Sequence, residues 1–309
     1  MPSFASDVKN ALSRTDTDRS CCQTAELAAL LRMGASMVTD GAHGLGLRFT
    51  ADNAAVARRV IRLLHTMDGA IETSVAMERT PQLRRRTYIV NIAAGESVTP
   101  LLTRLGFLDR GTLRTGTDRM LLRRKCCRAA YLRGAFLGGG SVNRPEASCH
   151  LEITTKSAVM GRALHTLLRR LHFPVGLTDR RDTYVVYLKE GDAVMDFLSL
   201  IGAEEAAEEI EVARNLKEVR AQVNRLVNVE TANLQRAVDA AAEQLAAIER
   251  LHSVGMLSSL PEDLRETAEM RRMYPEVSMA ELAALCHISK SGMSHRLRKI
   301  RAMAEEVSI

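Results

Sequence analysis

An internal repeat, which spans the first two thirds of the chain, constrains the fold more than any other feature of the sequence. Residues 27–36 match residues 132–141 at an offset of 105 positions, and each stretch has the pattern of an apolar helix that ends in small residues. Residues 47–50 and 151–154 then match at an offset of 104 positions, with the alternation of a strand. The chain is therefore expected to build two copies of one module.

The rest of the module can be followed in both copies. Each strand leads into a helix with one apolar face, then into a second alternating segment, and finally into a helix that ends at a glycine. The matched positions include Val56 with Met160, Val60 with Leu164, Tyr88 with Tyr184, Val90 with Val186, Leu102 with Leu198 and Gly106 with Gly202. We expect an α+β unit with antiparallel sheets: a first repeat with an N-terminal helix (1–110), a basic linker (111–128) and a second repeat (129–218).

The first helix of each copy is suited to close packing. Gly134 and Gly138 lie four residues apart and share one helix face, and Ala29 lies opposite in the first copy. Small residues allow two helix backbones to approach each other. We predict that the two helices cross at a pseudo-two-fold axis.

The C-terminal part, residues 219–309, has helical patterns only, which predicts a helical neck and a compact group of three helices. Apolar stripes at 210–226 and 234–248 fit either a bundle helix or a dimeric coiled coil. Capping-box patterns at 259–262 and 278–281 begin two of the three helices, and Pro275 ends the first of them near Tyr274. In the second helix we expect the buried residues to be Leu282, Ala283, Leu285 and Cys286.

The pattern of a third helix begins at Ser289. Together with the helix before it, this pattern predicts a helix-turn-helix motif. Met293, Leu297, Ile300 and Ala304 would face inward beneath a polar and basic outer face. His287 takes the turn position that glycine usually occupies. We predict that the residues that read base edges are Lys290, Ser291, Ser294, His295 and Arg296, and that those that bind phosphate are Arg298, Lys299 and Arg301. A three-helix protein-binding module is the alternative.

Further arginines flank the second alternating segment of each repeat. Arg84, Arg85 and Arg86 precede Tyr88, while Arg180 and Arg181 precede Tyr184. These five side chains are candidates for phosphate contacts, which would add affinity without sequence choice. The alternative is that they are ordinary solvated surface residues.

The composition fits a soluble, cytosolic protein with a polyanionic partner. The net charge is +6, and we find neither a signal-peptide pattern nor an apolar run long enough to cross a membrane. The six cysteines form two adjacent pairs and two single residues without a C-x-x-C arrangement, which argues against a disulfide framework or a zinc site. We expect no metal ion and no cofactor.

The two motif helices resemble a degenerate LAGLIDADG arrangement, in which two homing-endonuclease helices pack below a DNA saddle of antiparallel sheets. In that family the penultimate motif position is an acidic metal ligand. Gly34 and Gly139 occupy these positions here, and no acidic residue lies elsewhere in residues 30–36 or 132–141. The resemblance implies a DNA-binding shape without nuclease chemistry, so we expect no catalytic residue and no enzyme activity. The run Gly138-Gly-Gly140 lacks the lysine of a phosphate-binding loop.

Nearly the full chain resembles the WhiA family of regulators, which in actinobacteria act in sporulation and cell division. The resemblance rests on residues 3–9, 131–141, 224–235, 260–261 and 289–298. It implies a catalytically inactive LAGLIDADG-like domain joined to a helix-turn-helix, and an iron-sulfur partner of the WhiB type together with a sigma factor of RNA polymerase.

We therefore expect a sequence-specific transcription regulator that binds double-stranded promoter DNA and is associated with the nucleoid. Two other functions remain open. The paired helices could belong to a metal-dependent DNA endonuclease, and the acidic helix that begins at Glu204 could dock on RNA polymerase or its sigma factor as an adaptor.

Overall fold

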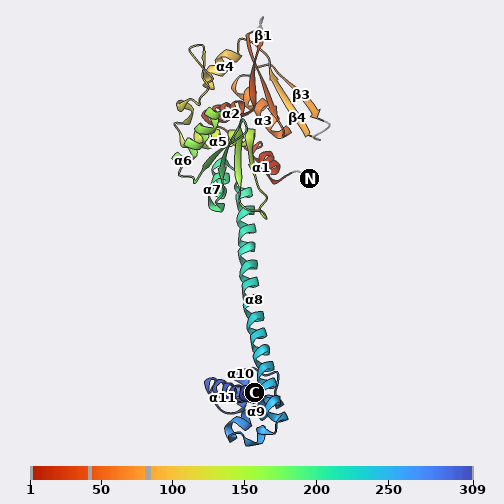
Figure 1. The fold of residues 1–309 in the computed structure, drawn as a ribbon. Coiled ribbons are helices and arrows are strands. Elements are labelled where there is room, and N and C mark those ends of the chain that lie inside the picture. The colour runs from red at the N-terminus through yellow and green to blue at the C-terminus, as the bar shows by residue number, and fades with distance from the viewer. Residues whose placement is uncertain (1–2, 41–43, 81–84, 308–309) are drawn as a thin grey trace. The chain divides into compact units, whose positions relative to one another are not determined.

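The computed structural model describes residues 3–40, 44–80 and 85–307, which divide into two compact units (Figure 1). The first unit, Met1–Leu216, contains helices and two four-stranded sheets, and the second, Lys217–Ile309, contains helices. The α+β class expected for the first part and the all-α class expected for the second are confirmed.

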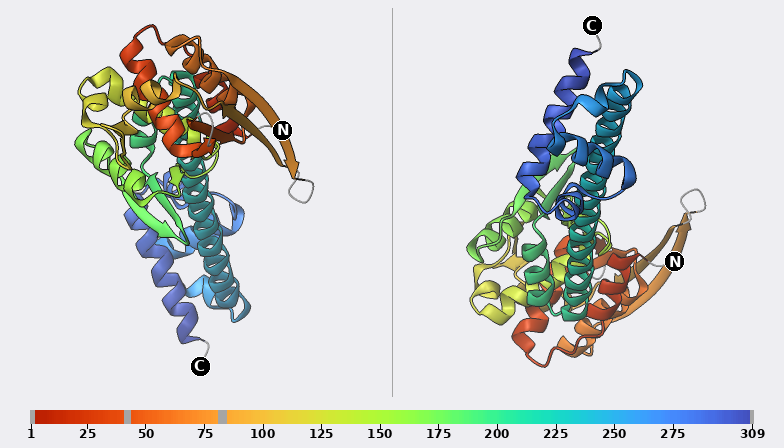
Figure 2. Two further views of the ribbon diagram at one scale, coloured as in Figure 1. Left: turned by 90° about the horizontal axis from the view of Figure 1, so that it is seen from above. Right: turned by 90° about the horizontal axis from the view of Figure 1, so that it is seen from below.

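The first repeat is an antiparallel sheet in the order β1-β2-β4-β3, covered by helices. β3 and β4 lie side by side as a long hairpin that extends away from the helices of this unit (Figure 2). The elements are α1 (Phe4–Leu12), α2 (Ser20–Gly34), β1 (Ala35–Asp40), β2 (Gly44–Ala51), α3 (Ala54–Met67), β3 (Thr73–Thr80), β4 (Arg85–Ile92) and α4 (Val98–Arg104).

The second repeat has the same topology, with the strand order β7-β8-β10-β9. Cross-strand pairing agrees residue by residue: Phe49 is opposite Val90 in the first sheet, and the equivalent Ile153 is opposite Val186 in the second. The predicted duplication is thus confirmed at the level of register. Its elements are α5 (Lys125–Gly139), β7 (Gly140–Val142), β8 (Leu151–Thr155), α6 (Ala158–Arg170), β9 (Gly176–Arg180), β10 (Thr183–Leu188) and α7 (Gly191–Ile201).

The helices α2 and α5 pack against each other in the centre of the first unit. A Cβ atom at Gly134 would lie 2.3 Å from the carbonyl oxygen of Glu26, and one at Gly138 would lie 2.6 Å from the Cβ of Met33. Any side chain at these positions would overlap the neighbouring helix, so the small residues are required by the crossing. The predicted close contact of the two motif helices is confirmed.

A buried ion group links the two repeats through α2, α3 and α5. Glu26 is fully buried and accepts hydrogen bonds from Nε of Arg59 at 2.7 Å and from Nε of Arg133 at 3.0 Å. The remaining guanidinium N–H groups donate to oxygens that include Thr15 O, Thr17 Oγ1 and Ile201 O. Buried charges are tolerated only when they are paired and hydrogen-bonded in this way. Apolar periodicity did not reveal this group.

The segment expected to be a linker is more regular than predicted. It contains β6 (Thr112–Leu113), which pairs with β5 (Leu108–Asp109), a 3-10 turn at Arg119–Leu122, and the first residues of α5. Arg32 of α2 holds this segment in place, because its guanidinium donates hydrogen bonds to the carbonyl oxygens of Leu105, Gly106 and Gly116.

One continuous helix, α8 (Glu204–Ser253), provides both apolar stripes that the sequence indicated. Ile210 and Ile248 near its two ends are buried, but Leu226 and Leu234 between them are 63% and 67% exposed. The stripes are therefore buried only at the ends of α8 in the single chain. No helix among the described residues is both long and apolar enough to cross a membrane.

The second unit closes around its own small core. Three helices pack on one another and on the last turns of α8: α9 (Glu262–Met273), α10 (Met279–Leu285) and α11 (Lys290–Glu306). The core side chains are Ala247, Ile248, Leu251, Leu260, Leu264, Ala268, Leu282, Ala283, Cys286, Met293, Leu297, Ile300 and Ala304.

Candidate nucleic-acid interface

Helices α10 and α11 form the predicted helix-turn-helix, and the sequence explains their bounds. Ser278 and Glu281 make a complete capping box at the start of α10, and Ser289 caps α11 by accepting a hydrogen bond from the N–H of Gly292 at 3.1 Å. His287 has a φ of +52°, so the turn uses the left-handed conformation that glycine usually supplies. The Ser278 hydrogen bonds also hold the pKa of Glu281 below its usual value.

Helix α11 has a sharply divided surface. Met293, Leu297, Ile300 and Ala304 are buried, as predicted. With 100° between successive residues, the opposite face is centred on Ser291, His295 and Arg298. Lys299 flanks this face, Lys290 is the first residue of the helix, and all five of these residues are exposed. We call these five residues the outer face of α11.

The outer face carries basic groups that are available within the second unit. Among the described residues, Lys290, Arg298 and Lys299 form no salt bridge within 4.0 Å. The first turn of α11 contains no acidic residue, and its N–H groups give that end of the helix a partial positive charge. Such a surface attracts phosphates and presents donors to base edges.

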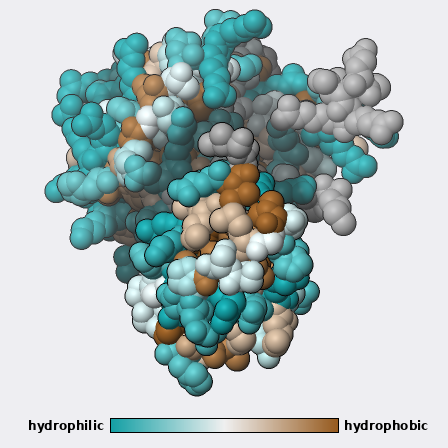
Figure 3. All heavy atoms as spheres, turned by 60° about the horizontal axis from the view of Figure 1, so that its bottom comes forward, coloured by the Kyte–Doolittle hydropathy of each residue, from teal (hydrophilic) through white to brown (hydrophobic). Residues whose placement is uncertain are grey.

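Figure 3 shows the molecular face at the bottom of Figure 1, where hydrophilic side chains alternate with hydrophobic patches.

Arg296, which we expect to read bases, contacts α9 in this structure. Its side chain is 22% exposed, and Nε lies 3.6 Å from Oδ2 of Asp263 while Nη1 lies 3.8 Å from Oε2 of Glu266. Nη1 also lies 3.3 Å from the carbonyl oxygen of Asp263. The side chain thus lies on the flank of α11 that faces α9, which a helical pattern alone does not identify.

Two other predicted contact residues are only partly available. Ser294 is half-buried, and Arg301 is exposed but forms ion pairs with Glu243 of α8 at 2.6 Å and with Glu305 at 3.3 Å. Exposed ion pairs are weak, so Arg301 can exchange these carboxylates for a phosphate at little cost.

Two structural expectations for this unit were wrong. Leu285 is 44% exposed, because α10 ends there and its side chain points away from α11 and the core. Ser259 does not cap α9; its hydroxyl donates to the carbonyl oxygen of Met256, and Pro261 is the residue that precedes the helix. The serine is used by the 3-10 turn at Met256–Ser259 instead.

The first unit has no room for the acidic residues of a LAGLIDADG nuclease at the matching positions. A Cβ atom at Gly34 would lie 2.8 Å from the carbonyl oxygen of Thr50, and one at Gly139 would lie 2.3 Å from that of Thr154. Both helix ends therefore pack directly on the equivalent strand of their own repeat. Steric overlap with backbone excludes a carboxylate at either position.

A hollow of about 1140 Å³ lies beside this end of α5. It is lined by three basic side chains, Lys9, Arg58 and Arg86, and one acidic side chain, Asp52. Of the predicted phosphate-binding arginines, Arg86 in β4 and Arg180 and Arg181 at the β9–β10 turn are exposed. Arg84 lies outside the described residues, and the side chain of Arg85 is likewise not described.

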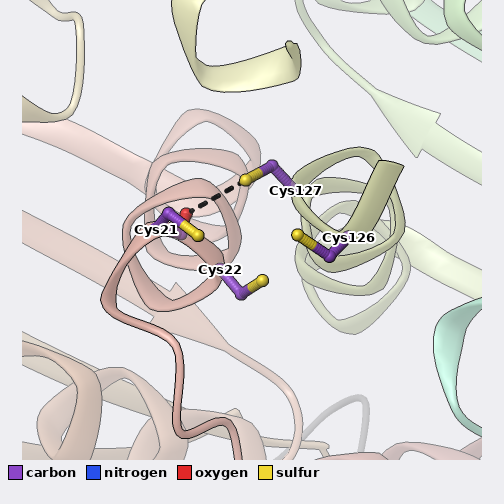
Figure 4. Close-up of side chains that lie close together, drawn as sticks. All are labelled: Cys21, Cys22, Cys126 and Cys127. Carbon is purple, nitrogen blue, oxygen red and sulfur yellow. Dashed lines mark hydrogen bonds between the residues drawn. The ribbon is translucent and has the colours of Figure 1, made fainter. Parts of the chain in front are cut away.

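The fold brings the four paired cysteines together, which their spacing along the chain did not predict. Cys21 and Cys22 in α2 face Cys126 and Cys127 in α5, and all four sulfur atoms lie within 4.8 Å of one another (Figure 4). Hydrogen bonding from Cys22 lowers the pKa of Cys126 to about 7, whereas burial raises the pKa of Cys22 to about 12. The signal was present in the sequence, since the two pairs are 105 positions apart, the offset of the motif helices themselves.

Comparisons with known proteins agree with this architecture. The family models of the WhiA N-terminal LAGLIDADG-like domain, the WhiA LAGLIDADG-like domain and the WhiA C-terminal HTH domain match residues 20–108, 128–220 and 223–304. The crystal structure of full-length DUF199/WhiA from Thermatoga maritima has the same fold, with a TM-score of 0.63 over 99% of each chain at 24% identity.

Two relatives cover almost the whole chain, and both carry the name "Probable cell division protein WhiA". The protein of Heliobacterium modesticaldum is 41% identical over 310 residues, which cover 99% of this chain and 97% of the relative. That of Desulforamulus reducens is 43% identical over 99% of this chain and 96% of its own length. At this identity over the full length, with all three domain models matched in order, the chain belongs to the WhiA family.

Proposed function

We propose that this chain is a sequence-specific DNA-binding transcription regulator that acts in cell division and sporulation and binds promoter DNA through α11. The observation that carries the proposal is the outer face of α11, which is exposed, basic and free of acidic residues in its first turn. A helix of this kind, held at a fixed angle by the helix before it, fits the major groove of B-form DNA.

The contacts divide by position along α11. Lys290, Ser291, Ser294 and His295 lie in its first half, the part that approaches base edges in helix-turn-helix proteins. Arg298, Lys299 and Arg301 lie beyond them and would bind phosphate. Arg296 acts as a positioning residue, because it ties α11 to α9 through Asp263 and Glu266.

The sheets of the first unit would provide a second, sequence-independent contact with the DNA backbone. Arg79 and Arg86 lie directly opposite each other on β3 and β4, and like charges in this arrangement destabilise a sheet. A bound phosphate would relieve the repulsion. Arg180 and Arg181 would make the equivalent contacts in the second repeat.

The same proposal places the protein on the nucleoid, with a WhiB-type iron-sulfur regulator and an RNA polymerase sigma factor as partners. The support for these partners is family membership alone. In this proposal the LAGLIDADG-like unit binds without cutting, because glycine packing excludes the acidic ligands at Gly34 and Gly139.

Selection of duplexes from a random pool by the full-length chain tests the proposal. We expect one enriched motif, and the His295→Ala variant should change the preference at one position of it at a cost of about 1–3 kcal/mol. The matched control is Arg265→Ala, a partly exposed residue of α9 that pairs with Glu262, and it should leave the motif unchanged.

Two outcomes would contradict the proposal. Cleavage of plasmid DNA in the presence of Mg²⁺ or Mn²⁺ would indicate an endonuclease. Tight association with RNA polymerase, combined with no salt-sensitive affinity for DNA, would indicate an adaptor that docks through the acidic start of α8.

A further inference from the structure

Four thiols converge where the N-terminal ends of α2 and α5 meet, at a point that the DNA-binding proposal does not use. Cys21 and Cys22 lie in the first turn of α2, and Cys126 and Cys127 lie at the equivalent places in α5. Figure 4 shows the four side chains directed into the space between the two helices. The duplication therefore places one pair of sulfur atoms from each repeat around one point.

We propose that Cys21, Cys22, Cys126 and Cys127 together bind one Zn²⁺ ion, which cross-links the two repeats. Four sulfurs at the usual Zn–S distance of about 2.3 Å form a tetrahedron with edges of about 3.8 Å. The four Sγ atoms already lie within 4.8 Å of one another, so small side-chain rotations complete the site. Thiolate sulfur in a tetrahedral set is the ligand chemistry that zinc prefers.

The surroundings offset the charge of such a site. Binding converts four thiols and Zn²⁺ into a Zn(Cys)₄ centre of charge −2 and releases four protons to solvent. Nη1 of Arg124 lies 3.5 Å from Sγ of Cys21, which places a positive charge beside the four sulfur atoms. The N-terminal ends of α2 and α5 also point their partial positive charge at this point, which favours thiolates.

The burial pattern fits a structural ion. Cys22 and Cys127 are buried, whereas Cys21 and Cys126 are half-buried, so an ion can enter from the side of Cys21 and Cys126 and is then shielded from water. Cys127 donates a weak hydrogen bond to the carbonyl oxygen of Cys21 at 3.7 Å, and this S–H is given up when the thiolate binds the ion. All four ligands then come from rigid helix ends.

Two simpler explanations predict different behaviour. Cysteine is a small apolar residue that can merely fill a close helix crossing, in which case no ion binds. Alternatively, two of the thiols could form a disulfide between α2 and α5, which would leave the other two unexplained. Both are outcomes of the experiment below.

The experiment uses the full-length chain, reduced, stripped of metal and kept without oxygen. After addition of ZnCl₂ and removal of excess, we expect about one zinc per chain by elemental analysis. In the folded protein, the four clustered thiols should then react with a thiol reagent much more slowly than in the metal-free chain, and unfolding in the presence of a chelator should make all six cysteines reactive. Co²⁺ in place of Zn²⁺ should give the visible absorption of tetrahedral thiolate-bound cobalt.

Variants locate the site. The double variant Cys22→Ser and Cys126→Ser, which removes one ligand from each helix, should lose the zinc and the cobalt absorption. The matched controls Cys149→Ser and Cys286→Ser, which alter the two cysteines outside the cluster, should keep both. Circular dichroism shows whether each variant is folded, and the wild-type measurements decide the question even if the double variant is not.

The proposal is overturned if the folded wild-type chain binds no zinc and all of its thiols react at the same rate with and without the metal. Stoichiometric iron in protein purified without added metal would overturn the identity of the ion. A disulfide between α2 and α5 that persists after zinc addition would overturn the site. None of these measurements involves DNA, so the DNA-binding proposal stands or fails separately.

Discussion

The two units of this chain differ in how their charged side chains are placed. The first buries a carboxylate, Glu26, and pairs it with two buried guanidinium groups at its centre. The second buries the guanidinium of Arg271, which donates hydrogen bonds to Oε1 of Gln244 and to the carbonyl oxygen of Val277. The outer face of α11 presents three exposed basic side chains, Lys290, Arg298 and Lys299. The buried ion group of the first unit therefore contributes to stability, whereas the exposed basic side chains of α11 are available to a ligand. This difference can be tested with substitutions that change either the free energy of unfolding or the affinity for DNA, but not both.

The largest effect is expected at Glu26. The Glu26→Ala substitution leaves Arg59 and Arg133 buried without a carboxylate, which should lower the free energy of unfolding of the first unit by about 3–5 kcal/mol. Urea unfolding followed by circular dichroism measures the change. Glu78→Ala is the control, since Glu78 is 65% exposed in its ion pair with Arg48 and should contribute about 0–1 kcal/mol. Equal effects of the two substitutions would remove the contrast between buried and exposed charge.

Gly139 should show the next largest effect. A methyl group there would overlap the carbonyl oxygen of Thr154, so Gly139→Ala should destabilise the first unit by about 3 kcal/mol. Gly95→Ala is the matched control, because no atom lies within 4 Å of the added Cβ. If Gly139→Ala were as stable as the control in the same urea titration, the steric exclusion of an acidic residue would be wrong.

Arg298 and Arg296 allow the roles of DNA binding and stability to be compared within one helix, α11. Arg298→Ala should weaken binding to all DNA sequences alike and reduce the slope of log affinity against log salt by about 1, without a loss of stability. Arg296→Ala should instead cost about 1 kcal/mol of stability in the second unit through lost contacts with α9, with the salt slope unchanged. Fluorescence anisotropy across a salt series, together with thermal unfolding, distinguishes the two roles. The reverse result would show that Arg296 binds DNA directly.

The smallest effect concerns pH. Because the pKa of Glu281 is lowered in the folded state by hydrogen bonding to Ser278, the stabilisation is present above its ordinary value of 4.5 and is lost as the pH falls through the folded-state value. Thermal unfolding of the second unit should therefore show a steeper loss of stability in acid for the wild type than for Glu281→Gln. Identical pH profiles would show that the capping box contributes no pH dependence.

Much of the fold could be predicted because the duplication repeats a pattern that the sequence carries locally. The alternation around Phe49 and Ile153 identifies strands, and the offset between the copies pairs them before any contact is known. The apolar positions of α11 were predicted for the same reason, since the core of the second unit lies on one side of the helix. The prediction that Leu285 is buried was wrong, because helical spacing does not show at which residue a short helix ends and leaves the core.

The candidate site was predicted less completely, because its details depend on neighbours that are distant in the sequence. Arg296 lies 33 positions from Asp263, and its direction depends on how α9 packs on α11. The cysteine cluster was missed because rules for metal ligands look for local pairs such as C-x-x-C. Here each local pair supplies two ligands, and the second pair comes from the other repeat.

By itself, the sequence determined which residues are apolar at which period, where α10 and α11 begin, and that one module occurs twice. These properties are local, and they act through hydrogen bonding and side-chain burial within one element. Only the tertiary structure decided that Glu26 meets two arginines, that Gly139 meets the backbone of β8, and that four thiols meet at one point. Such contacts join separate elements, which for Glu26 and Arg133 lie 107 positions apart, and their geometry follows from close packing between elements.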